Sequence, residues 1–160
     1  MFVVDTTVIS NFAKTESLDL MKAILGKDGV TTPQVVDEFK VGVKRGRYPN
    51  LEIPLKVLEL TEAERELYNL LNQSLGKGEA SCIAIAKFRN GILLSDDYDA
   101  RKKARLLGVK VSGTIGVLVL GVKRGIIELE DANNILNEML KKGFYAPIKR
   151  LEEVMPSSSP

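Results

Sequence analysis

Acidic residues directly follow two short apolar runs of this sequence. Asp5 closes the run at residues 2–4, and the adjacent Asp96 and Asp97 close the run at residues 92–94. Such runs predict buried strands of a parallel sheet, and ligands of open α/β sheets bind beyond the carboxyl ends of the strands. We therefore expect these carboxylates to face a crevice at one edge of a sheet. The alternative is that they only cap the helices that follow, a position in which Asp is favoured.

Glu38 and Glu79 are expected on helices near the same edge. At about 100° per residue, Glu38 falls on the shoulder of an apolar helical stripe, and Asp37 falls farther round. Glu79 opens a helix that is apolar almost all round over residues 80–86, so its carboxylate is expected near the interior and needs a partner such as a metal ion. The alternative is that Glu38 and Asp37 are solvated and that Glu79 only interacts with the helix dipole.

If these acids converge, they form an oxygen-rich pocket of the kind that binds Mg²⁺ or Mn²⁺. Such an ion can generate hydroxide and stabilise the charge of a phosphodiester without any His. The 160 residues contain no His and a single Cys, which excludes Ser-His-Asp and Cys-His catalysis and Cys-rich zinc sites. That residue, Cys82, lies in an apolar stretch, which is typical of a buried thiol.

Alternating strands and helices are needed to position these acids, and the sequence predicts them. Thr32 and Pro33 form a helix start, and Thr61-Glu62-Ala63-Glu64 is a capping box. Pro54 limits the apolar segment 53–60 to an edge strand or a strand start. The alternation is typical of an α/β fold with a mostly parallel sheet. The expected strands lie at 2–4, 92–94 and 109–111; one helix begins over 6–11, and others lie at 17–25, 33–43, 61–75, 79–86, 98–107, 114–122, 129–142 and, as a short turn, within 147–154.

Size and composition fit one globular domain. With 44% hydrophobic residues and a formal net charge of +2, the chain can bury a core and has no overall field that attracts nucleic acid. We expect residues 1–155 to form the domain and the polar residues 156–160 to be a disordered tail. The early acid at position 5 argues against a signal peptide, and the longest apolar run, 115–122, is far shorter than the ~20 residues that span a bilayer. The expected location is the cytoplasm.

Five short motifs, taken in order, resemble those of PIN-domain nucleases, in particular VapC-like toxins and related small prokaryotic PIN proteins. No motif is specific alone, but their order and rough spacing match the family over residues 1 to about 125. The matching segments are Val4-Asp5-Thr6-Thr7, Val36-Asp37-Glu38, Gly76-Lys77-Gly78-Glu79-Ala80, Leu94-Ser95-Asp96-Asp97 and Gly113-Thr114-Ile115-Gly116.

The resemblance implies a three-layer α/β/α fold, an acidic pocket for one or two Mg²⁺ or Mn²⁺ ions, and endonucleolytic cleavage of single-stranded RNA. It also implies the toxin of a toxin–antitoxin pair, with an antitoxin protein or a second copy of the chain, as a homodimer, among its partners. Thr7 matches a hydroxyl position two residues after the first acid of the family. The residues that match the family's acidic quartet are Asp5, Glu38, Glu79 and Asp97.

Three details of this match stay open. Asp96 competes with Asp97 for the last acidic place, so the expected metal ligands are Asp5, Glu79 and one or both of this adjacent pair. Asp99 is a more distant candidate. Glu79 is the longer acid at a place that often holds Asp in the family.

Two basic clusters follow these acids in the sequence and are expected to attract an RNA backbone across the pocket. Their effect should weaken as salt rises. The alternative is that they are ordinary surface charge. The chain has no Trp and few aromatic residues to stack bases, so a weak sequence preference is expected. The clusters are Arg101, Lys102, Lys103 and Arg105 after Asp97, and Lys44, Arg45 and Arg47 after Glu38.

Three other classes of protein fit the sequence less well. A PIN-like scaffold without catalysis, acting as an RNA-binding or protein-interaction module, has no reason to keep all four acids, and a metal-binding assay separates it from a nuclease. A haloacid-dehalogenase-type phosphatase needs an Asp two residues after its nucleophile, where this chain has Thr7. A phospho-receiver domain needs an acidic pair right after its first strand, whereas Asp5 is followed by Thr6.

Overall fold

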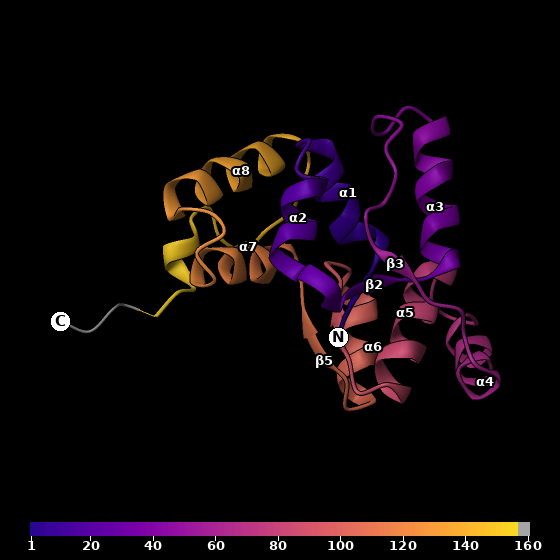
Figure 1. Ribbon diagram of the computed structural model, residues 1–160. Coiled ribbons are helices and arrows are strands. Elements are labelled where there is room, and N and C mark those ends of the chain that lie inside the picture. Colours follow the sequence, from indigo (N-terminus) through magenta and orange to yellow (C-terminus); the bar gives the residue numbers. More distant parts are fainter. Residues whose placement is uncertain (157–160) are drawn as a thin grey trace.

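A five-stranded sheet lies at the centre of the computed structural model, which describes residues 1–156 (Figure 1). The strand order is β3-β2-β1-β4-β5, and every neighbouring pair is parallel, in agreement with the predicted parallel sheet. The strands are β1 (Phe2–Val4), β2 (Gly29–Thr31), β3 (Lys56–Val57), β4 (Ile92–Leu94) and β5 (Lys110–Ser112).

The register of the sheet brings the ends of its central strands together. Val4 of β1 pairs with Leu94 of β4. The backbone amide of Asp5 then donates to the Leu94 carbonyl at 2.9 Å, and the amide of Ser95 donates to the Ser112 carbonyl at 3.0 Å. The carboxyl edge of the sheet therefore places Asp5 beside the segment that starts at Ser95.

Eight α-helices in the described part of the chain flank the sheet, which gives the three-layer α/β/α fold. They are α1 (Thr6–Lys14), α2 (Leu18–Leu25), α3 (Pro33–Lys44), α4 (Glu62–Leu71), α5 (Lys77–Phe88), α6 (Tyr98–Leu106), α7 (Thr114–Lys123) and α8 (Leu129–Lys141), with the 3₁₀ turns η1 (Gly26–Asp28) and η2 (Leu151–Glu153). In Figure 1, α1 and α3 extend from the sheet toward the top of the view, and α8 lies beside the upper end of α1.

Side chains that the sequence predicts as caps start several of these helices. Thr32 accepts a hydrogen bond from the backbone amide three residues on at 3.1 Å, with Pro33 as the first residue of α3. Thr61 and Glu64 form the expected reciprocal capping box at the start of α4. Pro54 precedes β3, which is an edge strand as expected. Local side-chain chemistry thus sets where the helices and the edge strand begin.

The structure departs from the expected elements in a few places. The strand β2 has no clear signal in the sequence, because Val30 is its only aliphatic residue. Its Thr31 is nevertheless fully buried, because its hydroxyl donates to the Val4 carbonyl at 2.7 Å. The helix α4 ends at Leu71, earlier than expected, because the chain then forms tight turns. The strand β5 lies one residue later than predicted.

Apolar side chains from the strands and from α5 fill the interior. Val3 and Leu93 of the central strands are fully buried, and every residue in the range 80–86 is buried, as expected for a helix that is apolar all round. Within that range, burial raises the pKa of the Cys82 thiol well above its ordinary value. Cys82 is therefore a core residue and is not an activated nucleophile.

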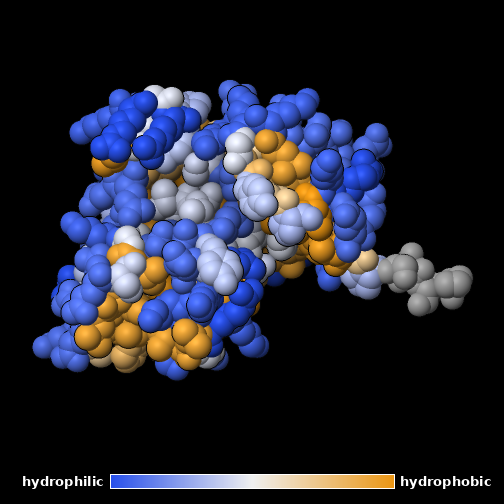
Figure 2. Space-filling view, turned by 180° about the vertical axis from the view of Figure 1, so that it is seen from behind, coloured by the Kyte–Doolittle hydropathy of each residue, from blue (hydrophilic) through white to orange (hydrophobic). Residues whose placement is uncertain are grey.

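The face opposite to that of Figure 1 is mostly hydrophilic, with apolar areas at the lower end and at one side (Figure 2). The exposed large apolar residues include Leu70, Phe88 and Leu106, from α4, α5 and α6. Within residues 1–156, none of the helices has the length and apolar character needed to cross a membrane. The expected disordered tail falls almost wholly on residues 157–160, which lie outside the described residues.

Candidate active site at the carboxyl edge of the sheet

Asp5 follows β1 and has only 1% of its surface exposed. One carboxylate oxygen accepts from the Thr6 amide at 2.6 Å. The other accepts from the Ser95 hydroxyl at 2.7 Å and, over a longer distance of 3.4 Å, from the Thr7 hydroxyl. Asp5 thus caps α1 with one oxygen, as the capping alternative holds, while its second oxygen faces the end of β4. Capping and a place in the site are compatible for this residue.

Glu38 connects three helices at this edge. Its Oε2 accepts from the Thr6 hydroxyl at 2.8 Å at the start of α1, and its Oε1 accepts from the Gly78 amide at 2.8 Å at the start of α5. A Cβ added at Gly78 would lie 2.5 Å from Oε2, so the carboxylate fills the space that a side chain there would take. Glu38 is partly buried and Asp37 is exposed, which confirms the helical phase expected from the sequence.

Glu79 lies in the first turn of α5, next to the Glu38 carboxylate. Its Oε2 accepts a long hydrogen bond of 3.4 Å from the Gly76 amide. Burial raises the pKa of Glu79, and the negative charges of Asp97, Glu38 and Asp99 raise it further. Glu79 therefore lies within electrostatic range both of the acid on α3 and of the acids that follow β4.

The two adjacent acids after β4 have different surroundings. Asp97 caps α6, because its Oδ2 accepts from the backbone amide three residues on at 2.9 Å. Asp96 instead binds the start of α7. The Thr114 amide donates to its Oδ1 at 2.9 Å, and the Asn11 side chain donates to its Oδ2 at 2.9 Å. Of this pair, Asp97 is the one whose charge acts on Glu79.

Thr7 and Asn11 support Asp96 from one face of α1. The Thr7 hydroxyl accepts from the Asp96 backbone amide at 2.9 Å, and the Asn11 side chain donates to the Thr114 hydroxyl at 3.2 Å as well as to Asp96. The motif resemblance indicates Thr7 but does not indicate Asn11. The spacing of four residues, which places both side chains on one helix face, is the signal that could have found it.

Ser95 is a second polar residue of the site that is not predicted from the sequence. It is fully buried, and its hydroxyl donates to Asp5 at 2.7 Å while accepting from the Asp97 amide at 3.2 Å. Ser95 therefore fixes the first and last acids of the expected quartet relative to each other. Its position at the end of β4, directly before the acidic pair, is the available signal.

Burial and crowding change the acidity of Asp5. Burial raises its pKa from 3.8 to about 7, against the effect of the Ser95 hydrogen bond, and the charges of Glu79 and Glu38 add to the rise. Burial is a larger cause of this rise than the repulsion between the acids. Near neutral pH, this carboxyl group holds a proton about half of the time unless a cation takes the proton's place.

Carboxylates are suitable ligands for a hard divalent cation, but the carboxylates of this site are not arranged around one common position. Within residues 1–156, no three Asp, Glu or Cys side chains lie close enough together to hold a metal ion as they stand. The expectation that Asp5, Glu79 and one or both of Asp96 and Asp97 hold an ion, directly or through its waters, stays a prediction. Mg²⁺ commonly keeps several waters and takes only one or two carboxylates directly, and such a site fits the buried Asp5 with Glu79 nearby.

The basic residues after Asp97 differ in what they contact. Arg101 is partly buried, and its Nη1 donates to the carbonyls of Ser95 at 2.8 Å and Ser112 at 2.9 Å. It therefore connects the ends of β4 and β5 and supports the acidic pair. This structural contact differs from the role in RNA binding that is expected from the sequence. Lys102 is exposed, and Lys103 is partly buried.

The other predicted residues lie on the surface. Lys44 ends α3, Arg45 follows it, and both are exposed. Arg105 is exposed on α6. Asp99 is exposed in the first turn of α6, where its charge acts on Glu79 without joining the hydrogen-bonded network of the site.

Comparison with known proteins places the chain in a family. Residues 1–159 match the model of the family DUF3368, which is described as a PIN domain. No curated protein matches the chain, and no solved structure matches it. The family match spans nearly the whole chain and accompanies a wholly parallel sheet flanked by helices. The chain therefore belongs to the PIN-domain family, whose members have a nuclease fold.

Proposed function

We propose that this protein is a divalent-metal-dependent endoribonuclease that cleaves single-stranded RNA at the carboxyl edge of its sheet. The observation that carries the proposal is the buried carboxyl group of Asp5, which is held by Ser95 and lies within electrostatic range of Glu38 and Glu79. A buried acid among other acids is unfavourable unless it gains a compensating charge, and a cation is such a partner. Membership of the PIN-domain family supports the nuclease class.

In this proposal, Asp5, Glu79 and Asp97 hold Mg²⁺ or Mn²⁺ directly or through its waters, and Asp96 is a supporting residue. A bound ion supplies an activated water and stabilises charge on the phosphodiester. Asp5, whose pKa of about 7 leaves it partly protonated near neutral pH, would hold the ion in its deprotonated form. Glu38 adds negative charge from a position fixed by two hydrogen bonds of 2.8 Å.

Cations on both sides of the acids attract the phosphate chain, which the acids alone repel. The exposed Lys102 with Lys103 on α6, and the exposed Lys44 with Arg45 at the end of α3, supply this attraction in our proposal. Such contacts are to phosphates and carry no base information, so cleavage should show a weak sequence preference.

The proposal is tested with the purified chain and a labelled single-stranded RNA. Cleavage should require Mg²⁺ or Mn²⁺, stop with EDTA, and fall at least 100-fold in Asp5→Asn. The matched control is Asp37→Asn, which removes an exposed acid one residue before Glu38 and should cut like the parent. Equal cleavage with and without EDTA, or full activity of Asp5→Asn, would overturn the proposal.

One observation favours a second function, that of a PIN-like scaffold without catalysis. The acids within residues 1–156 do not form a ready metal site, and most of their oxygens already accept hydrogen bonds from the protein. A scaffold of this kind would bind RNA or a protein partner without a metal ion. Binding of Mn²⁺ that Asp5→Asn abolishes would reject the scaffold, and an absence of Mn²⁺ binding would favour it.

The sequence motifs extend the main proposal to a VapC-like toxin that acts in the cytoplasm and is restrained by an antitoxin protein. The support for this step is the motif resemblance over residues 1 to about 125, together with the family match. Growth arrest on expression of the chain, relieved by Asp5→Asn, would support the toxin assignment. Normal growth with an active, soluble enzyme would contradict it.

A further inference from the structure

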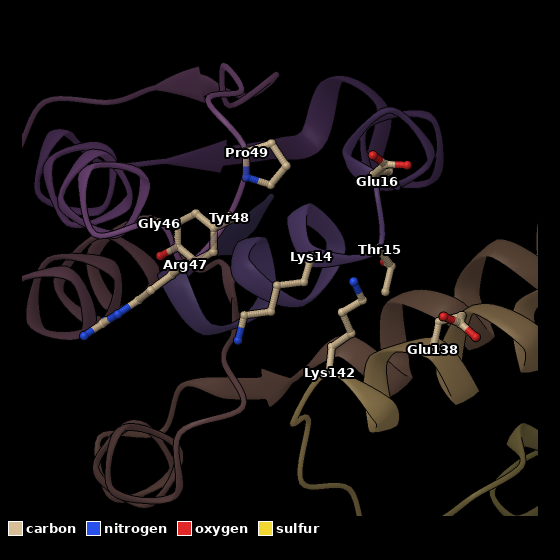
Figure 3. A pocket seen from close by; sticks show the side chains of 9 residues that line it. All are labelled: Lys14, Thr15, Glu16, Gly46, Arg47, Tyr48, Pro49, Glu138 and Lys142. Carbon is tan, nitrogen blue, oxygen red and sulfur yellow. The ribbon is translucent and has the colours of Figure 1, made fainter.

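A pocket of about 840 Å³ lies beyond the acids, where α1 ends and the chain leaves α3 (Figure 3). Three cationic side chains line it from different elements. Lys14 is the last residue of α1, Arg47 lies in the loop after α3, and Lys142 follows α8. Figure 3 shows these three side chains on separate ribbons, with the guanidinium of Arg47 pointing away from the two lysines. Three cationic residues that are far apart in the sequence thus line the same pocket.

The three cations of this pocket outnumber its two acids, Glu16 and Glu138. Glu138 lies 3.3 Å from the Nζ of Lys141, so its charge is already shared with a neighbour on α8. Glu16 is exposed, in the turn after α1. Within residues 1–156, Lys14, Arg47 and Lys142 form no ion pair, and their side chains donate no hydrogen bond. Their donors are therefore available to an anion.

Tyr48 fixes the backbone that carries Arg47. Its ring stacks on Phe39 with the centroids 4.6 Å apart, and it is buried against α3 at Gly42, where an added Cβ would lie 2.5 Å from Cζ of the ring. Phe39 directly follows Glu38 of the acidic site. Arg47 therefore has a fixed place relative to the acids, although its guanidinium is exposed.

The helix α1 connects this pocket to the acidic site. Its first residue, Thr6, donates to Glu38, and its last residue, Lys14, lines the pocket. A helix of nine residues is about 13 Å long, so the two sites are separated by a few nucleotides of an extended strand. The spacing suits one polyanion that contacts both places at once.

We propose that the pocket lined by Lys14, Arg47 and Lys142 binds backbone phosphates of the single-stranded RNA, a few nucleotides from the scissile bond. This inference rests on the proposed function, because it gives the substrate of that site a second point of contact. The fork of Arg47 suits a phosphate, and the two lysines add point charges. The pocket thereby sets the path of the strand between α1 and the loop after α3.

The test is RNA binding measured by fluorescence anisotropy with a labelled single-stranded oligonucleotide in EDTA, at several salt concentrations. The triple variant Lys14→Ala/Arg47→Ala/Lys142→Ala should bind at least tenfold more weakly at low salt. Its slope of log affinity against log salt should be shallower by about 2, since each phosphate contact contributes about 0.7 on a single strand. Lys14 is partly buried, so its substitution in the triple variant can disturb the fold. The single variant Arg47→Gln changes only an exposed residue and keeps the test decisive in that case. Its slope of log affinity against log salt should be shallower than that of the parent by about 0.7.

The control variant Lys22→Ala/Lys27→Ala/Lys110→Ala removes the same charge from exposed residues. Two of these precede β2 and one starts β5, so they lie toward the amino ends of the strands. The control should keep the slope of the parent. A pocket variant that behaves like this control would overturn the inference, even if the parent cuts RNA. If the parent binds RNA without cutting it, the proposed function fails and the slopes still decide the role of the pocket. A parent that binds no RNA overturns both.

Discussion

Glu38 and Gly78 lie 40 residues apart in the sequence, yet the backbone amide of Gly78 donates a 2.8 Å hydrogen bond to the Glu38 carboxylate. The same carboxylate accepts from the Thr6 hydroxyl at 2.8 Å. Glu38 therefore holds the starts of α1 and α5 together and keeps its own charge beside the other acids. The absence of a side chain at position 78 is a condition of this arrangement.

Gly78→Ala should disturb the site, because the new Cβ would lie 2.5 Å from Glu38 Oε2. Ala in place of Gly normally stabilises a helix by about 1 kcal/mol. Here we expect no gain in the free energy of unfolding and a loss of RNA cleavage of at least tenfold. Gly76→Ala is the matched control, since its Cβ would lie 3.7 Å from Oε1, an ordinary contact. Melting curves and cleavage rates of the two variants check the prediction, which fails if both behave alike.

The pKa of Asp5 makes the stability of the metal-free protein depend on pH. The folded pKa of about 7 lies above the ordinary value of 3.8, so the folded state binds this proton more tightly than the unfolded state. The contribution of Asp5 to stability is therefore fully present below pH 4 and is lost as pH rises toward 7, by up to about 4 kcal/mol. Asp5→Asn should be the more stable protein at pH 8 and should show a flatter profile between pH 4 and pH 7.

The comparison of Asp5→Asn with the parent is made by chemical denaturation in EDTA. Asp37→Asn serves as the control, because it removes an exposed acid and should follow the pH profile of the parent. If Asp5→Asn is less stable than the parent at pH 8, the buried carboxyl is a net stabilising group and our account of the site is wrong.

A bound divalent ion should reverse this effect in the parent. Millimolar Mn²⁺ at pH 8 is expected to raise Tm of the parent, because ligands that bind only the folded state stabilise it by mass action. The shift should be at most half as large in Asp5→Asn and in Glu79→Gln, and unchanged in Asp37→Asn. It should also shrink below pH 7, where a proton competes for Asp5. A Tm that does not respond to Mn²⁺ in the parent would count against a metal site.

Substitutions of Asp96 and of Asp97, the two adjacent acids after β4, should have different effects on stability and on metal binding. Asp97→Ser keeps a residue that caps helices well, so stability should change by less than about 1 kcal/mol while the Mn²⁺ shift and RNA cleavage are lost. Asp96→Ala removes the acceptor of Thr114 and Asn11 and should destabilise the fold by about 1–3 kcal/mol. Metal titration and denaturation of both variants test this difference. If only Asp96→Ala loses metal binding and its fold stays stable, Asp96 is the metal ligand and Asp97 is the supporting residue.

Arg101 and Lys102 should also differ, although they are neighbours in one basic cluster. Arg101→Ala removes two hydrogen bonds to carbonyls at the ends of β4 and β5 and should lower Tm by several degrees. Lys102→Ala should leave Tm unchanged, because the residue is exposed, and should weaken RNA binding at low salt. Thermal melts and binding isotherms of the two single variants check this. Equal melting temperatures would contradict a supporting role for Arg101.

The sequence predicts most of this fold because the signals are local. Thr61 with Glu64, and Thr32 with Pro33, mark helix starts that the structure confirms. The strand β2 escapes prediction because Thr31 becomes a buried residue only through its hydrogen bond to the Val4 carbonyl, a contact between distant segments.

The expected acids are brought to one edge, but their supports could not be fully predicted. Local patterns mark Ser95 and Asn11 as candidates, but they do not identify their hydrogen-bond partners, which lie 90 and 85 positions away. Arg101 looks like surface charge in the sequence because its two carbonyl partners are backbone atoms, which carry no sequence signal.

Anomalous diffraction from crystals grown in Mn²⁺ would show whether the carboxyl edge of the sheet binds a divalent ion. We predict an anomalous peak in contact with the Asp5 carboxylate and within reach of Glu79 or Asp97, directly or through one water. The peak should be absent from crystals of Asp5→Asn grown in the same way. Crystals of the parent that show no peak at this edge in millimolar Mn²⁺, with Asp5 still bonded only to Thr6 and Ser95, would contradict the account.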